Sequence, residues 1–318
     1  MHPILFEVPR PTSWGTALII TILVALGLGL ELREQRRTEM PVDTIRLTVI
    51  ALFSALLGVI FSLGLRRWGP VPVRAWGTML MLGFTAGMLW AIRDVRDDNQ
   101  FDTDYIIDVT LAILVGAIVG ARLLSVALNW GHYAGTPSEL LRVWAGGLSF
   151  HGGLAGGFLG GALLTVRRGL SVPRAMDLMA PPIALGYAIT RIGCFLNGCC
   201  YGAPTESVFA VTFNKLANTG VPGIDLHPTQ LYAAAASVLI FGILLAVRQR
   251  VKVNGHLFGW YVMIYSGARF IIEQFRRNAS AEVFRPLAPL TIAQTGSIAI
   301  IIIVAALMAV SHARAKRQ

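Results

Sequence analysis

Nine runs of apolar residues dominate this chain, and each is long enough to cross a membrane as a helix. A bilayer core about 30 Å thick requires about 20 such residues, and the absence of water there forces the backbone to bond to itself. Only 14% of the 318 residues are charged, whereas soluble domains carry about 25%. We therefore predict an all-α, polytopic membrane protein. The predicted spans are 15–31, 45–65, 74–92, 105–128, 148–166, 175–196, 230–247, 257–275 and 291–311.

The basic residues between these spans predict the orientation of the chain. If the N-terminus lies outside, the inner loops hold 15 Lys and Arg residues and the outer segments hold nine. Positive charge accumulates in cytoplasmic loops, so we predict an outside N-terminus and a cytoplasmic C-terminus. Loop cations of this kind set topology and attract anionic lipid headgroups. The net charge of +10 therefore gives no reason to expect a nucleic-acid partner.

The pattern of spans also predicts how the chain is divided. Residues 1–70 form an N-terminal extension with two spans, and residues 71–318 form a core with seven. Two outer segments of that core, 131–147 and 197–229, are long enough to build a small outer cap. Within the second, Ser207–Phe213 alternates between polar and apolar residues as a strand does.

Three arginines, Arg122, Arg191 and Arg269, lie inside apolar spans. A charge at membrane depth costs about 2.5–3.5 kcal/mol on insertion scales, so a chain that keeps one usually needs it for an anion, a proton or a partner charge. Few carboxylates lie nearby, which favours a pocket for a negatively charged lipid or solute. Alternatives remain open: Glu273 is spaced to pair with Arg269 and could instead pair with Arg191, and Arg122 could snorkel to the outer interface.

Glycines are concentrated between positions 146 and 161. Small residues let membrane helices approach closely, which accounts for 156–161. The pairs at 146–147 and 152–153 flank His151 at the entrance of a span, where glycine can also free the backbone to approach a ligand. Histidine titrates near neutral pH and suits proton transfer, although a structural histidine is the alternative.

All three cysteines, Cys194, Cys199 and Cys200, fall within seven residues. This is not a disulfide framework. The cluster could be a redox pair, or it could hold a metal with a fourth ligand from elsewhere. Free cysteine is more often a small, buried packing residue, so we expect packing here and neither a metal nor a cofactor.

Four motifs follow one another in an order that resembles the prolipoprotein diacylglyceryl transferase family. The resemblance covers about residues 70–311, and the first two motifs are specific in combination. The motifs are Gly146-Gly-Leu-Ser-Phe-His151-Gly-Gly-Leu, Arg191-Ile-Gly-x-Phe-Leu-Asn197-Gly with Gly202, His227-Pro-Thr-Gln-Leu-Tyr232, and Tyr265-x3-Arg269-Phe-x2-Glu273-x2-Arg276.

The resemblance implies a seven-span enzyme of the bacterial inner membrane that functions in lipoprotein biosynthesis. Such enzymes move the diacylglyceryl group of phosphatidylglycerol onto the lipobox cysteine in the signal peptide of a prolipoprotein, and glycerol phosphate leaves. It implies no cofactor. By resemblance, Arg191 and Arg269 hold the lipid phosphate, and His151 is catalytic or orients the substrate. The remaining implied substrate-binding or pocket residues are Gly146, Gly152, Gly202, Glu273, Asn197, Tyr265, Arg122 and Trp76.

The chemistry of arginine supports this reading independently of the family. Displacement of a phosphate from a glycerol carbon requires that the charge on the leaving group be neutralised. A guanidinium pairs two oxygens with its planar fork and stays charged. The substrate brings its own thiol nucleophile, so the enzyme needs only a way to remove the thiol proton. Histidine is the side chain most often used for such proton transfer, so His151 is the first candidate and Tyr265 is a weaker one.

The chain departs from the family pattern at several positions. Cys194 replaces a usual Asn, Cys199 a usual Glu, and Trp76 a frequent Tyr. About sixty residues with two spans also follow the segment His2–Pro9, where the family usually proceeds directly to its first conserved span. These departures keep two alternatives open: a non-catalytic relative that binds anionic lipid or lipoprotein, and a transporter for a small anion.

Overall fold

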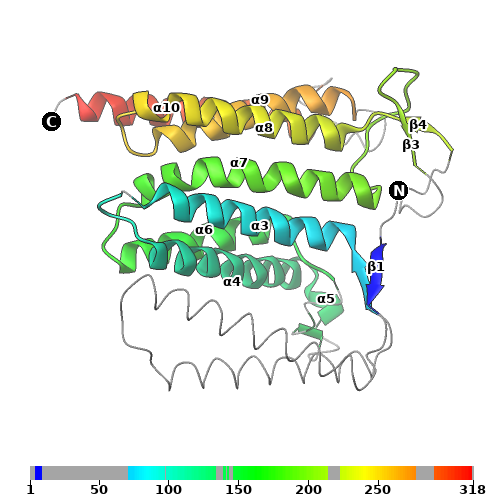
Figure 1. The fold of residues 1–318 in the computed structure, drawn as a ribbon, viewed down its shortest axis with the longest axis horizontal. Coiled ribbons are helices and arrows are strands. Elements are labelled where there is room, and N and C mark those ends of the chain that lie inside the picture. The colour runs from blue at the N-terminus through cyan, green and yellow to red at the C-terminus, as the bar shows by residue number, and fades with distance from the viewer. Residues whose placement is uncertain are drawn as a thin grey trace. The chain divides into compact units, whose positions relative to one another are not determined.

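The structure, a computed structural model, describes residues 4–8, 71–96, 98–133, 139–140, 142, 146–213, 223–276 and 290–316 (Figure 1). The predicted spans 15–31 and 45–65 lie outside the described residues. The chain divides into two compact units that meet in sequence between Ala75 and Trp76. We describe each unit by itself.

The first unit contains a two-stranded ribbon. Strand β1 (Ile4–Val8) pairs antiparallel with β2 (Val71–Arg74), with Val8 opposite Val71 and Ile4 opposite Arg74. The register shifts between Ile4 and Phe6. The N-terminal segment therefore lies beside the residues that precede the first helix of the second unit.

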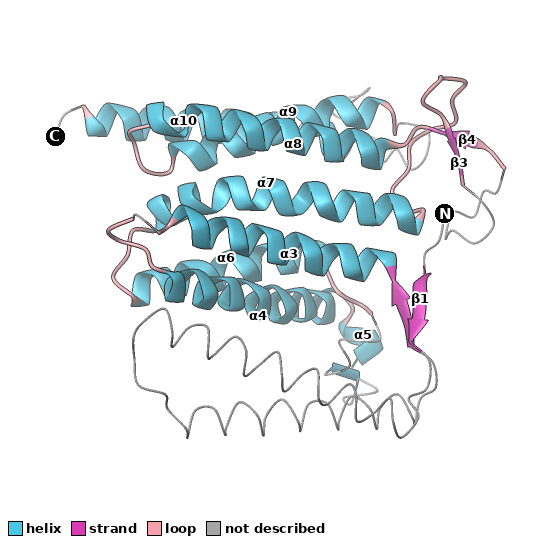
Figure 2. Cartoon of the chain, viewed as in Figure 1, coloured by secondary structure: helices cyan, strands magenta, loops and turns pink. Residues whose placement is uncertain are grey.

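The described residues of the second unit form seven long helices, each overlapping one predicted span of the core (Figures 1 and 2). Within the part of the chain that the structure describes, five segments have the length and apolar composition of a membrane crossing: Ala75–Asp94, Thr103–Leu128, Val172–Asn197, Thr229–Arg250 and Ile292–Ala315. The predicted all-α membrane fold is confirmed, and the total of nine spans stays a prediction. The helices are α3 (Ala75–Asp94), α4 (Thr103–Leu128), α6 (Phe150–Arg167), α7 (Val172–Asn197), α8 (Thr229–Val247), α9 (His256–Gln274) and α10 (Ile292–Ala315).

Helices α4 and α6 pack against each other through glycines. A Cβ atom on Gly156 would lie 2.2 Å from the carbonyl oxygen of Gly116, and one on Gly120 would lie 2.4 Å from that of Gly152. Only residues without a side chain permit such close backbones. The predicted packing role of the glycines at 156–161 is confirmed, and Gly152 shares it.

Helix α7 packs against α8 and α9, and α10 packs against α9. The Ser237 hydroxyl of α8 donates a 2.8 Å hydrogen bond to the carbonyl oxygen of Ala184 on α7. A buried apolar cluster fills the space where the three helices meet, with members such as Ala180, Leu244 and Tyr261. This packing fixes the faces of α7 and α9 that carry Arg191 and Arg269.

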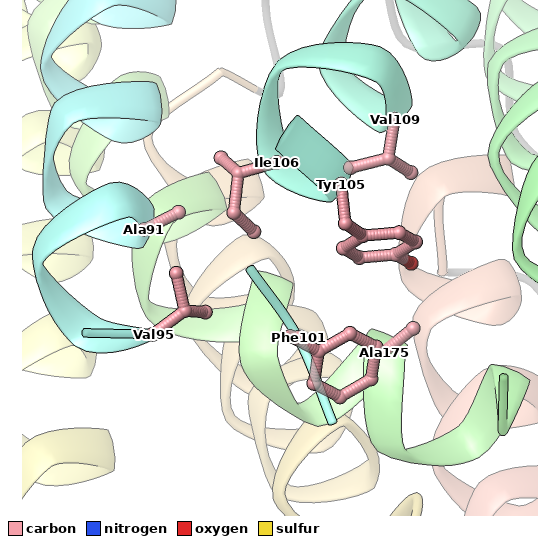
Figure 3. Close-up of a cluster of buried hydrophobic side chains, with 7 residues drawn as sticks. All are labelled: Ala91, Val95, Phe101, Tyr105, Ile106, Val109 and Ala175. Atoms are coloured by element: carbon pink, nitrogen blue, oxygen red, sulfur yellow. The ribbon is translucent and has the colours of Figure 1, made fainter. Parts of the chain in front are cut away.

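A buried cluster and several ion pairs hold α3, α4 and α7 together. Apolar side chains from α3, α4 and α7 meet where α3 ends and α4 begins (Figure 3). Beside them, Arg174 lies 2.9 Å from Asp98, and Arg248 and Arg168 contact Asp94 and Asp108. The cluster consists of Ala91, Val95, Phe101, Tyr105, Ile106, Val109 and Ala175.

Asp98 organises the loop between α3 and α4. Its carboxylate accepts the backbone N–H groups of Gln100 and Phe101 and pairs with Arg174. Burial alone would raise the pKa of this carboxyl, but these hydrogen bonds and the nearby guanidinium offset it and bring the pKa below its ordinary value. The loop is thus held in place by an ionised side chain.

A short hairpin follows α7 in the predicted cap segment. Strands β3 (Val211–Thr212) and β4 (Asp225–Leu226) pair antiparallel, so the strand is shorter than the predicted Ser207–Phe213. The hydroxyls of Thr205 and Ser207 accept the backbone N–H groups of Ser207 and Phe209 and hold the first half as a turn. The other cap segment includes the short helix α5 (Trp130–Tyr133).

Candidate functional site

Three arginines line one narrow cleft between α7, α8 and α9. The cleft has a cavity volume of about 20 Å³. Arg191 comes from α7, Arg269 from α9, and Arg276 from the turn that follows α9. The other lining residues are Tyr187, Cys200, Thr229, Ala233, Ala236, Ser237, Ile240, Tyr265, Ala268 and Ile272.

Two tyrosines contact each other beside Arg191 and Arg269, one helical turn earlier on the same helices. Tyr187 precedes Arg191 by one helical turn on α7, and Tyr265 precedes Arg269 by one turn on α9. The two hydroxyls lie 3.2 Å apart, with Tyr265 donating, and the ring centroids are 5.3 Å apart in an edge-to-face arrangement. The guanidinium carbon of Arg191 lies 4.7 Å above the Tyr187 ring centroid, a cation–π contact that fixes the side chain without neutralising it.

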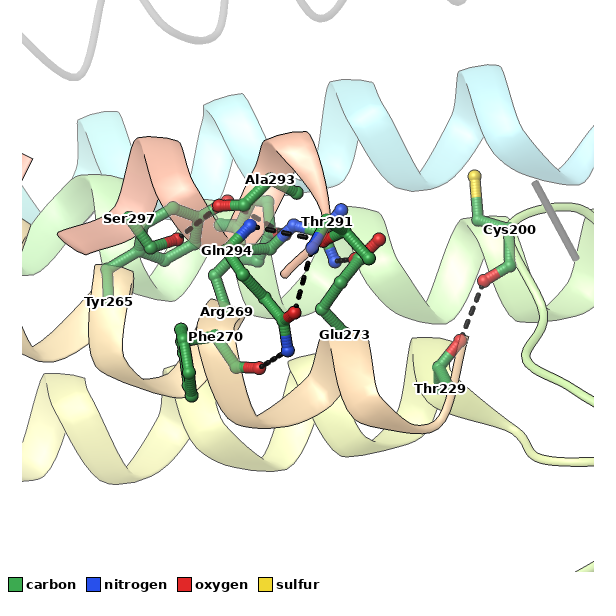
Figure 4. Close-up of polar contacts among 11 residues, drawn as sticks. Cys200, Thr229, Tyr265, Arg269, Phe270, Glu273, Thr291, Ala293, Gln294 and Ser297 are labelled. Atoms are coloured by element: carbon green, nitrogen blue, oxygen red, sulfur yellow. Dashed lines mark hydrogen bonds and ion pairs between the residues drawn. The ribbon is translucent and has the colours of Figure 1, made fainter. Parts of the chain in front are cut away.

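The cleft carries more positive than negative charge. Arg269 Nη1 lies 2.6 Å from Glu273 Oε2, an ion pair that lacks the alignment of a hydrogen bond (Figure 4). No carboxylate of the described residues lies within 4 Å of Arg191 or Arg276. Arg191 is therefore not held by Glu273, and two guanidinium groups are available to an anion.

Sequence reasoning did not select Tyr187 and Arg276 as site residues. Helical spacing contained the signal for both. Arg276 lies seven residues after Arg269, and Tyr187 lies four before Arg191, so each falls on the same face as an arginine that the sequence analysis did select.

The segment after α7 is fixed against the first turn of α8. The backbone carbonyls of Cys199 and Cys200 accept hydrogen bonds from Gln230 and Thr229 at 2.6 and 2.9 Å. A Cβ atom on Gly202 would lie 2.4 Å from the Phe275 carbonyl oxygen. The absence of a side chain at Gly202 therefore lets this segment pass close to the end of α9, beside the cleft.

Arg122 holds a second group of predicted residues together. It is 8% exposed and donates hydrogen bonds to the carbonyl oxygens of Gly146 and Gly147 at 2.9 and 3.0 Å. It also donates to the carbonyls of Glu139 and Leu140. Both glycines have positive φ, a conformation that favours residues without a side chain. Arg122 thus fixes the turn that leads into α6.

His151 and Trp76 are exposed and do not line the arginine cleft. His151 lies in the first turn of α6 beside Phe150, which is 77% exposed. Trp76 lies in the first turn of α3. The structure thus brings Arg191, Arg269 and Tyr265 together with Glu273 beside them. It places the remaining predicted residues outside the cleft lining: Trp76, Arg122, Gly146, His151, Gly152, Asn197 and Gly202.

A larger, apolar cleft lies between α3, α4 and α7. It has a cavity volume of about 320 Å³ and is lined mainly by aliphatic and aromatic residues, including Phe84, Met88, Ile113 and Ile183. Tyr187 lines this cleft as well as the arginine cleft. A polar space that can bind an anion and an apolar space of this size therefore share one wall, as a site for a lipid with an anionic headgroup requires.

The model of one protein family matches residues 63–310, which is most of the chain. Its description is prolipoprotein diacylglyceryl transferase. The chain belongs to this family. The resemblance seen in the four motifs is confirmed, and the matched range includes both clefts and the cysteine cluster.

Curated relatives carry the name phosphatidylglycerol–prolipoprotein diacylglyceryl transferase. The protein from Geobacter sulfurreducens is 34% identical over 213 residues, 66% of this chain and 80% of the relative. That from Bacillus mycoides is 34% identical over 239 residues, 74% and 86% of the two chains. That from Clostridium tetani is 31% identical over 227 residues, 71% and 87%. This member of the diacylglyceryl transferase family thus aligns with most of each relative.

Proposed function

We propose that this protein is a phosphatidylglycerol–prolipoprotein diacylglyceryl transferase that modifies the lipobox cysteine of its substrate. The observation that carries the proposal is the arginine cleft. Two guanidinium groups without a described carboxylate partner, and a third paired only with Glu273, meet between apolar helices. Such a site is costly in a membrane unless an anion occupies it.

The two clefts suit the two parts of a phospholipid. The arginine cleft takes the phosphate, and the apolar cleft between α3, α4 and α7 takes acyl chain. Tyr187, on the wall that the two clefts share, lies near the junction of headgroup and glycerol backbone. The names of the curated relatives support phosphatidylglycerol as the donor and a prolipoprotein as the acceptor.

The reaction exchanges one carbon–oxygen bond for one carbon–sulfur bond. The acceptor thiol loses its proton, its sulfur bonds to the terminal glycerol carbon, and the bond from that carbon to the phosphate oxygen breaks. The phosphate, singly charged as a diester, gains a second negative charge as it leaves. Arg191, Arg269 and Arg276 stabilise that charge because they are positioned before it forms and lie in surroundings of low dielectric.

The second group of residues has a positioning role in this proposal. Arg122 holds the turn at Gly146 and Gly147, and that turn positions the exposed His151. We propose that His151 orients the incoming prolipoprotein. Asn197 and Trp76 stay proposed substrate contacts, at the end of α7 and the start of α3.

We further propose that the protein lies in the bacterial inner membrane with its C-terminus in the cytoplasm. The cleft then opens toward the outer face, where a secreted substrate emerges. A reporter thiol at Arg314 tests the orientation, because this residue is exposed at the end of α10. A membrane-impermeant maleimide is expected to label the peptide that carries the R314C substitution only after the membrane is permeabilised, as located by peptide mapping. Labelling of that peptide in intact spheroplasts would overturn the orientation.

The experiment that tests the function combines purified protein, phosphatidylglycerol and a lipobox peptide, with mass spectrometry of the peptide. We expect a mass increase equal to one diacylglyceryl group. Arg191→Ala and Arg269→Ala are expected to remove this product. Arg314→Ala is the matched control, because it removes a cation of the same type outside the cleft. Lipid binding without product would contradict the transferase function, and full turnover by both cleft variants would contradict the phosphate site.

A further inference from the structure

The three cysteines form a cluster of sulfur atoms that the reaction described above does not use. Their Sγ atoms all lie within 4.8 Å of one another. Cys194 is buried in the last turns of α7, Cys199 is half-buried, and Cys200 is exposed and lines the arginine cleft. A set of packing residues would be buried throughout, whereas this set runs from the helix interior to the wall of the site.

The backbone that carries Cys199 and Cys200 is held in place before any ligand arrives. Cys200 has a φ of 62°, and it is the single non-glycine residue with positive φ in the described segments. Strained backbone of this kind persists only where the surroundings fix it. Here Thr229 and Gln230 bind the carbonyls of Cys200 and Cys199, and Figure 4 shows the Cys200 sulfur pointing away from its bonded carbonyl.

The spacing and the donor set suit zinc. Three sulfurs at about 2.3 Å from a tetrahedral zinc lie about 3.8 Å apart. Side-chain rotations that move each sulfur by less than about 1 Å therefore bring the observed cluster to this spacing. No histidine, aspartate or glutamate joins the cluster anywhere in the described chain. Three protein ligands leave one position open, which is the arrangement of catalytic rather than structural zinc sites.

We propose that Cys194, Cys199 and Cys200 bind one zinc ion whose open position takes the thiol of the acceptor cysteine. This deepens the proposed transferase function and rests on it for the identity of the acceptor. It also departs from the expectation that the cysteines are packing residues. An acceptor thiol bound to zinc is deprotonated at neutral pH, because coordination to the metal removes the thiol proton outright. His151, which does not line the cleft, is then not required as the base.

The bonds balance without any further reactant. The acceptor thiol gives its proton to solvent water as a zinc–sulfur bond forms. That sulfur then bonds to the glycerol carbon, the carbon–oxygen bond to the phosphate breaks, and the zinc–sulfur bond breaks because a thioether is a weak ligand. Three thiolates around one zinc ion carry one net negative charge, so they offset only part of the positive charge of Arg191, Arg269 and Arg276 in the same cleft.

The test uses the full-length chain, purified in detergent with an affinity tag that contains no histidine. Mass spectrometry of the metal content is expected to give about one zinc per chain. Cys194→Ser and Cys200→Ser should each reduce this at least tenfold while circular dichroism confirms that the helices remain. Thr212→Ser, on the exposed hairpin strand, is the matched control and keeps the metal. Zinc at background level in the folded wild type, or retention by Cys200→Ser, would overturn the site.

Cobalt substitution tests the open position. Cobalt in a thiolate site absorbs visible light, and we expect its spectrum to change when a lipobox peptide is added but not when the cysteine of that peptide is replaced by serine. An unchanged spectrum would overturn thiol coordination. A disulfide between Cys194 and either neighbour in the purified protein, found by peptide mapping without reductant, would also overturn the proposal.

Activity then separates this proposal from the transferase function. If the chelated, metal-free protein lipidates the peptide at the full rate, the zinc proposal fails and the transferase stands. If zinc binds and the peptide changes the cobalt spectrum but no peptide is lipidated, the transferase function fails and the metal site stands.

Discussion

Replacement of Arg191 by lysine separates the geometry of the guanidinium from its charge. Arg191 stacks on Tyr187 at 4.7 Å and is not paired with any described carboxylate. Lysine keeps the charge but has neither the planar fork nor the stacking face. If Arg191 grips the phosphate with two parallel hydrogen bonds, Arg191→Lys retains one of them at best.

The magnitude follows from what is lost. One hydrogen bond to a charged group contributes about 1.5–3 kcal/mol. The transition state is then destabilised by about 1.5–3 kcal/mol, which lowers kcat/KM by about 13-fold to 160-fold. The charge that develops on the leaving phosphate makes most of this a loss of kcat rather than a rise in KM.

The assay is the initial rate of peptide lipidation in mixed micelles over a range of phosphatidylglycerol concentrations, together with thermal unfolding of each variant. We expect Arg191→Lys to lose activity with little change in Tm, because Arg191 holds no partner charge. Arg122→Lys is the contrast, since it removes several hydrogen bonds to backbone carbonyls and should lower Tm. If Arg191→Lys keeps full activity, or if it loses activity only in proportion to unfolding, the phosphate-binding argument is wrong.

Three further predictions follow from other parts of the structure. Ile183→Trp places a bulky ring in the apolar cleft, so it should slow lipidation with long-chain phosphatidylglycerol more than with a short-chain analogue; equal slowing would argue against acyl binding there. Gly156→Leu should prevent α4 and α6 from packing, because even a Cβ would lie 2.2 Å from the Gly116 carbonyl, and loss of folded protein by size-exclusion chromatography is the readout. The pKa of Asp98 is lowered in the folded protein, so the stabilisation from its carboxylate is present above about pH 3.9 and is lost as the pH falls through the folded value. Asp98→Asn should therefore lower the free energy of unfolding by about 1 kcal/mol at pH 7 and by progressively less under strongly acidic conditions, measured by denaturant unfolding.

Much of the fold was predictable because the bilayer imposes simple rules on sequence. Long apolar runs predicted every long helix described in the core, and the small residues of α6 predicted its close packing against a neighbouring helix. The partner glycines Gly116 and Gly120 on α4 were not singled out, because they are spread through an ordinary apolar run. The hairpin strand was predicted too long, since side-chain hydroxyls of Thr205 and Ser207 compete for the backbone.

The site was predictable only in part because proximity between helices is not encoded in local pattern. A charge inside a span identified Arg191 and Arg269, and the structure places both on one cleft. The same signal identified Arg122, whose donors instead bind backbone carbonyls around Gly146. Spacing in the sequence could not distinguish an arginine whose guanidinium can bind an anion from one whose donors already bind backbone carbonyls.

The most direct measurement of the central claim is a ³¹P NMR spectrum of the reaction of purified protein with phosphatidylglycerol and lipobox peptide. The account predicts that one glycerol phosphate appears for each peptide modified, and that neither forms with the Arg191→Ala, Arg269→Ala double variant. A double variant that releases glycerol phosphate at the rate of the wild type would contradict it, as would modified peptide without released phosphate.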